Sequence, residues 1–236
     1  MKFIRETLYE GFVRSGSDKL SSLGIGKIQL IKEWVEKIDL KNYTINDDYT
    51  IDVIGTINLY QKIIPEYIHF GIVKGYFNCS ETGIKTLNGL IKQCWSFSCI
   101  GNELKSLEGG PTSVRGVYNC SENLLTSLKG VSKDVTSLFC DHNNLRDLEY
   151  CPMNKDGMLI SLFCQNNLLT SLKGSPKIIE GDFSIQDNLL KSLKYAPKSV
   201  SGDIWLGTNN LSASEIKFYK NSIVLGGKIY SKNQSK

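Results

Sequence analysis

The chain has 236 residues, of which 41% are hydrophobic, 22% charged and 10% aromatic. This is the composition of a folded protein, and it excludes a wholly disordered chain. The formal net charge is +4, and residues 214–236 carry all of it, with five lysines against one glutamate. Residues 1–213 are therefore neutral overall, which argues against a protein that coats nucleic acid with a basic body.

The sequence gives no sign of export. Charged residues interrupt the first segment at Arg5, Glu6 and Arg14, and no run of about eighteen apolar residues offers a membrane span. The chain contains seven cysteines, an odd number. We therefore expect a cytoplasmic protein with reduced thiols.

Two helices and a hairpin are expected before the main body of the chain. Residues 2–12 and 26–40 each place apolar side chains at helical spacing. Residues 43–59 alternate between apolar and polar side chains around Asp47 and Asp48, which is typical of a β-hairpin. Together these elements would cover the open end of a repeat structure.

The next part of the chain is an internal repeat with a spacing of 20 to 24 residues. One apolar position, here called the anchor, marks each repeat. An apolar residue precedes each anchor by two positions, and leucine or isoleucine follows it by five. Asparagine stands three positions after six of the seven clear anchors. The seven anchors are Cys79, Cys99, Cys120, Cys140, Cys164, Ile185 and Leu206, and a weaker one is Leu59.

The repeat has a physical interpretation. Alternation around the anchor predicts one short strand in each unit. A unit of about twenty residues cannot bury its apolar side alone, so neighbouring units must stack and pair their strands into a parallel sheet. The asparagine is expected to point inward, where its amide satisfies backbone groups of the turn that follows the strand.

This pattern, L-x-L-x-x-N-x-L-x-x-L, resembles the leucine-rich repeat. Proline twelve residues after several anchors is similar to the short repeats of bacterial leucine-rich proteins. The resemblance implies an α/β fold: a leucine-rich-repeat solenoid with one parallel sheet on its concave face. We expect an N-terminal helical and hairpin cap over residues 1–54, about eight repeats over 55–214, and a C-terminal β cap with a basic tail over 215–236. Residues 222–232 would form a final hairpin or strand.

Five of the seven cysteines stand at anchors, so we expect them to be buried core residues. Successive Cβ atoms would lie about 4.8 Å apart, longer than the roughly 3.8 Å that a disulfide prefers. Cys94 and Cys99 form a C-x4-C pair, a poor zinc spacing without a second pair. We expect no metal, no cofactor and no disulfides between repeats.

Nothing in the sequence predicts an enzyme. The chain has two histidines, His69 and His142, and lacks the common nucleophile, metalloprotease and nucleotide-binding motifs. A non-catalytic protein is the expectation.

Basic residues recur six and nine positions after the anchors, which gives the solenoid a lysine edge. Two interpretations stay open: a solvated face that keeps the protein soluble, or a contact surface for an anion or nucleic acid. The residues are Lys85, Lys105, Arg146 and Lys191, and then Lys129, Lys173 and Lys194.

The outward side of the sheet is the expected binding surface. The position before the anchor is small and polar in the first repeats, whereas three of its last four residues are Phe139, Phe163 and Trp205. Exposed aromatic rings are typical of interface hot spots, although the two phenylalanines can also simply pack on each other. The other candidate partner-binding residues beside them are Asp141, His142, Gln165, Asp182, Gln186 and Asp203.

The favoured function is therefore a protein–protein interaction module. Short cysteine- and asparagine-rich repeats of this kind look like those encoded by large phages and mobile elements, which implies a partner protein in a bacterial host. Two alternatives remain: a binder of nucleic acid or an anionic ligand through the lysine edge and basic tail, and a structural subunit of a larger particle.

Overall fold

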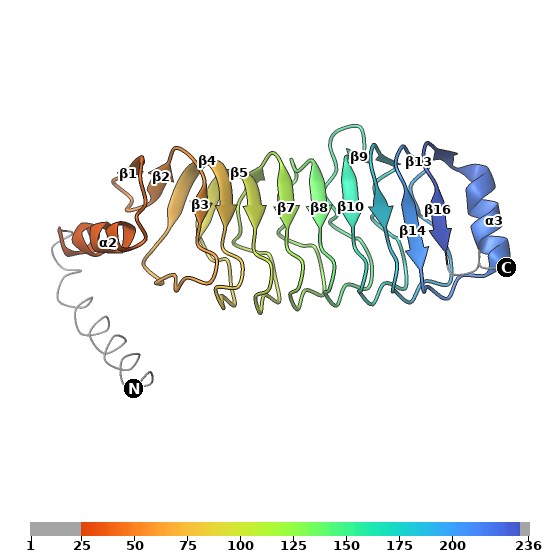
Figure 1. Ribbon diagram of the computed structural model, residues 1–236, viewed down its shortest axis with the longest axis horizontal. Helices are drawn as coiled ribbons and strands as arrows, with labels where there is room; N and C mark the ends of the chain where they lie inside the picture. Colours follow the sequence, from red (N-terminus) through yellow and green to blue (C-terminus); the bar gives the residue numbers. More distant parts are fainter. Residues whose placement is uncertain (1–24, 232–236) are drawn as a thin grey trace.

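The computed structural model describes residues 25–231, and the helix expected over residues 2–12 lies outside this range. The described chain winds into one elongated stack of repeats with a helix near each end (Figure 1). The stack is a β-solenoid of parallel strands, as the repeat predicted.

The N-terminal end is closed by a helix and a hairpin. Helix α2 (Ile25–Lys37) buries Ile31, Trp34 and Val35, because these residues recur at helical spacing on one face. Strands β1 (Tyr43–Ile45) and β2 (Ile51–Val53) then pair antiparallel. The carboxylate of Asp48 accepts the backbone N–H of Thr50 and so stabilises the turn between them. Both expected elements are confirmed.

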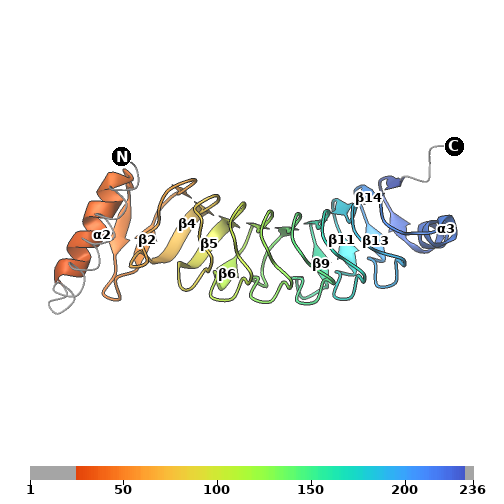
Figure 2. The same cartoon turned by 90° about the horizontal axis from the view of Figure 1, so that it is seen from below.

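The larger sheet has twelve strands, and β2 is the first of nine that run parallel along it. The larger sheet lies on the inner side of a gentle bend of the stack (Figure 2). The parallel pairing extends beyond residues 55–214 by one strand at each end. The other eight strands are β4 (Phe70–Asn78), β5 (Ile91–Ser98), β7 (Val117–Asn119), β8 (Ser137–Phe139), β10 (Ser161–Phe163), β12 (Phe183–Ser184), β14 (Ile204–Gly207) and β16 (Ile229–Ser231). Two short strands, β3 (Ile57–Asn58) and β6 (Ser113–Val114), pair with β4 and β5.

A second, four-stranded sheet was not expected from the sequence. Its strands are also parallel, and each comes just before the corner that leads into the larger sheet. Each is only two residues long, too short to give a period of its own. They are β9 (Met158–Leu159), β11 (Ile178–Ile179), β13 (Ser199–Val200) and β15 (Val224–Leu225).

The apolar repeat positions form one continuous core. All seven anchors are buried, as are the residues two positions before them. In the N-terminal half those residues are aromatic, and Phe70, Phe77, Phe97 and Tyr118 contact one another in series with ring centroids 4.9–6.0 Å apart. The expected burial of the anchor cysteines is confirmed.

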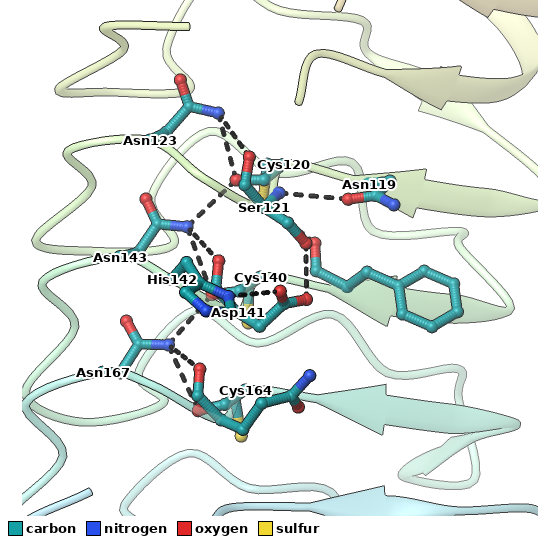
Figure 3. Close-up of polar contacts among 12 residues, drawn as sticks. Asn119, Cys120, Ser121, Asn123, Cys140, Asp141, His142, Asn143, Cys164 and Asn167 are labelled. Atoms are coloured by element: carbon teal, nitrogen blue, oxygen red, sulfur yellow. Dashed lines mark hydrogen bonds and ion pairs between the residues drawn. The ribbon is translucent and has the colours of Figure 1, made fainter. Parts of the chain in front are cut away.

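The asparagines point inward and connect successive repeats (Figure 3). The Asn143 amide nitrogen lies 3.0 Å from the carbonyl oxygen of Cys120, in the preceding repeat, and 3.2 Å from that of Cys140. Its oxygen accepts the N–H of Leu125. The same contacts recur at Asn123, Asn167 and Asn188, so each side chain satisfies backbone groups of two repeats.

The C-terminal end has the strands that the sequence predicted and adds a helix that it did not. Helix α3 (Ala213–Ser222) follows Asn209, the asparagine of the repeat at Leu206. The Ser212 hydroxyl caps the helix by accepting the N–H of Glu215. Tyr219 is buried and donates its hydroxyl to the carbonyl of Pro197. The expected strands are present, but β15 and β16 join different sheets and each runs parallel to its neighbour, so they form no hairpin. Neither described helix has the length and apolar character needed to cross a membrane.

Candidate partner-binding face

Four aromatic side chains form a line on the outward side of the larger sheet. Phe139, Phe163, Trp205 and Tyr230, here called the aromatic ladder, occupy the same position on β8, β10, β14 and β16. Their successive ring centroids lie 4.9, 6.4 and 5.8 Å apart, and each pair is stacked. The strands that their spacing predicted are confirmed, and so is the packing of the two phenylalanines on each other.

The stacking decides which part of each ring can meet a ligand. Interplanar angles of 11–29° place the ring faces against one another, so the ladder presents mainly ring edges to solvent. A guanidinium group that binds by a cation–π contact would need a free ring face. The ladder therefore suits apolar side chains laid across its edges.

Tyr230 was missed by the sequence analysis. It lies beside Trp205 in the register and its side chain is 44% exposed. The signal is the local match between GDIW, which ends at Trp205, and GKIY, which ends at Tyr230. The replacement of the following leucine by Ser231 concealed this last repeat.

Beside the ladder, Asp141 joins two other polar side chains (Figure 3). Its carboxylate accepts the Ser121 hydroxyl at 2.6 Å and lies 2.9 Å from Nδ1 of His142. The acid thus stands between the serine and the histidine. A nucleophilic serine needs the histidine itself as its base, so these contacts hold Asp141 in place and activate no hydroxyl.

The two candidate glutamines follow their anchors on neighbouring repeats, and both are half-buried. The Gln165 side-chain oxygen is buried without a hydrogen-bond partner among the described residues. The backbone carbonyl of Gln186 accepts the amide of Asn188. These glutamines therefore lie at the edge of the ladder, and the Gln165 side-chain oxygen is not open to a partner on this face.

Asp182 and Asp203 connect successive repeats, a structural role that was not expected from the sequence. Each stands three positions before its anchor and accepts a backbone N–H from the next repeat. Asp182 accepts the N–H of Asp203 at 2.9 Å, and Asp203 accepts that of Lys228 at 2.8 Å. Their carboxylates hold successive repeats together and also flank the ladder.

The lysine edge is partly neutralised by ion pairs on the protein itself. Lys85 pairs with Glu103 at 3.1 Å, Lys129 with Glu108 at 2.8 Å, and Lys173 with Glu149 at 2.5 Å. These side chains are largely exposed, so the pairs add little stability. They do reduce the positive field that a phosphate would meet.

All seven cysteines are free and buried. The Cys79 and Cys164 thiols each lie 3.3 Å from a carbonyl oxygen in the next repeat. Burial raises the pKa of every one of these thiols, and for Cys94 it raises the pKa to about 12. Among residues 25–231, no three His, Cys, Asp or Glu side chains are grouped to hold a metal.

No protein-family model matches the chain, and no curated protein is found as a relative.

Proposed function

We propose that this chain is a leucine-rich-repeat protein that binds a partner protein through the aromatic ladder and acts without catalysis. The aligned leucine, asparagine and cysteine positions support this repeat type. Seven free thiols fit a reducing cytoplasm. The similarity to repeats of phages and mobile elements points to a protein of a bacterial host as the partner.

The ladder is the observation that carries this proposal. Its rings extend over the repeats of β8 to β16 and stand on strands whose other side is fully buried. Such a surface is rigid before it meets a partner, so little conformational entropy is lost on binding. Aromatic groups in this setting are the ones that most often dominate interface energies.

The nucleic-acid alternative has weaker support. It depends on lysines of which three pair with glutamates of this chain. Phosphate binding would require those pairs to open and would weaken steeply with salt. The alternative predicts that substitution of the lysine edge abolishes binding, whereas the ladder proposal predicts no such loss.

The test compares two variants in affinity purification from extracts of the native host. The F163A/W205A variant removes the middle of the ladder, and the K85A/K105A/K191A variant removes basic side chains elsewhere. We expect one protein to be retained by the wild type and the lysine variant but lost from the ladder variant. Retention by the ladder variant together with loss from the lysine variant would overturn the proposal. Size-exclusion chromatography of the purified protein tests the remaining alternative, because a structural subunit of a larger particle would elute as a large assembly.

A further inference from the structure

The charges of this protein are segregated by face. We define the concave face as the four outward positions that stand three and one before and one and two after each anchor, in the seven repeats from Cys79 to Leu206. It contains no lysine or arginine, and its one histidine is His142. It contains six carboxylates: Glu81, Glu122, Asp141, Asp182, Asp187 and Asp203. A chain of net charge +4 therefore presents an acidic concave face.

The acidic residues are concentrated around the aromatic ladder. Asp182 and Asp203 stand on one side of it, two positions before Ser184 and Trp205, respectively. Asp141 and Asp187 stand on the other side, after their anchors. One lysine, Lys228, stands directly before β16 and donates its backbone N–H to the Asp203 carboxylate. An apolar line bordered by carboxylates on both sides is thus the dominant feature of this face.

The dimensions of the ladder limit what can lie on it. It extends from β8 to β16, which is four strand spacings or about 19 Å. It is one residue wide, because the flanking outward positions are polar or small. About 13 residues of α-helix, or about six of extended chain, would cover that length.

We propose that the occupant of this face is a lysine- or arginine-rich segment of the partner protein. It lays apolar side chains along the ladder and places its basic side chains against the flanking carboxylates. The inference rests on the proposed function and adds the chemistry of the partner. Opposite charges across the interface accelerate association and reject acidic competitors, nucleic acid among them.

A displayed library of random 16-residue peptides tests the inference without knowledge of the natural partner. Peptides selected on the wild-type protein are sorted by whether they still bind the F163A/W205A variant. We expect the ladder-dependent peptides to be enriched in lysine and arginine together with apolar residues. Ladder-dependent peptides that are neutral or acidic would overturn this inference and leave the proposed function standing. Absence of ladder-dependent peptides would overturn both.

A charge variant provides the second readout. D141N/D187N removes two negative charges from the concave face at constant size, and E108Q/E149Q removes two from the lysine edge as the matched control. We expect the dissociation constant of a selected peptide to rise about tenfold in the first variant and to change less than twofold in the control. Equal changes in both variants would show a general charge effect and refute the inference. Unchanged denaturation midpoints verify that both variants are folded.

Discussion

The rings of Phe163 and Trp205 stack at 6.4 Å although a whole strand lies between their backbones. Two strand spacings amount to about 9.6 Å, so the rings must lean toward each other. The residue between them, Ser184, is small and only 3% exposed. Its size lets the rings close above it, and the ladder is therefore continuous rather than two separate aromatic pairs.

Truncation of the ladder should destabilise the protein more than an ordinary surface change. Trp205→Ala removes ring contacts on both sides and should lower the free energy of unfolding by about 1–2 kcal/mol, compared with under about 0.5 for most surface sites. Tyr230→Ala removes one ring contact and should cost about half as much. Urea denaturation measures both. Equal, negligible effects would show that the stacking contributes nothing.

Loss of an inward asparagine should be more severe. Asn143→Ala leaves the Leu125 N–H without its side-chain acceptor inside the core. It also removes one of the two asparagine amides that donate to each of the carbonyls of Cys120 and Cys140. We expect a cost of about 1–3 kcal/mol in chemical denaturation.

The matched control is the neighbouring asparagine. Asn144 is half-buried, and its side chain makes no hydrogen bond within the described part of the chain. Asn144→Ala should cost less than about 0.5 kcal/mol. Ser121 is no neutral control, because it is buried and donates to Asp141. If both asparagine variants lose the same stability, the inward role of Asn143 is refuted.

Alkaline pH should unfold this protein because its thiols are buried. The pKa of each cysteine is raised in the folded chain, while an unfolded thiol has a pKa of about 8.5. Above that pH the unfolded state holds fewer protons than the folded state, so stability is intact below about pH 8.5 and falls as the pH rises. Each thiol contributes up to about 1.4 kcal/mol per pH unit.

Denaturation under reducing conditions at pH 8 and pH 10 measures this effect. By pH 10 each thiol should favour the unfolded state by about 2 kcal/mol, and the chain has seven. Because Cys99→Ala removes one titrating group, its stability should depend less steeply on pH than that of the wild type. A flat wild-type profile, or rapid labelling of native thiols at pH 8, would contradict the buried cysteine ladder.

The core could be predicted from the sequence because the same spacing of apolar residues occurs in every repeat. Seven anchors are each followed by leucine or isoleucine five positions later, and six of them by leucine eight positions later, which leaves one register that places these repeated residues inside. The outward register followed directly from it, which is why Phe139, Phe163 and Trp205 were placed on the correct strands.

The features that were missed occur where the repeat pattern breaks. Helix α3 begins where the repeat ends, because Ser214 stands in place of the leucine expected eight positions after the last anchor. Ser212 and Glu215 nevertheless have the spacing of a helix cap. The role of Asp182 depends on the corner between the two sheets. A single sequence shows neither the second sheet nor the direction in which a carboxylate at that corner points.

Gly202 tests that corner directly. It stands four positions before its anchor, and an added Cβ would lie 2.3 Å from the Asp182 carboxylate and 2.6 Å from the Gly181 backbone. Gly202→Ala must displace the carboxylate that accepts the Asp203 N–H, so both steric strain and a lost hydrogen bond result. We expect a loss of about 2–4 kcal/mol.

Thr136 is the control, because it also stands four positions before its anchor but the preceding repeat has Val117 in place of the aspartate. Thr136 already carries a half-buried side chain, so Thr136→Ala should cost less than about 1 kcal/mol. Thermal and urea denaturation compare the two variants. Wild-type stability of Gly202→Ala would mean that Asp182 moves freely and does not join the repeats.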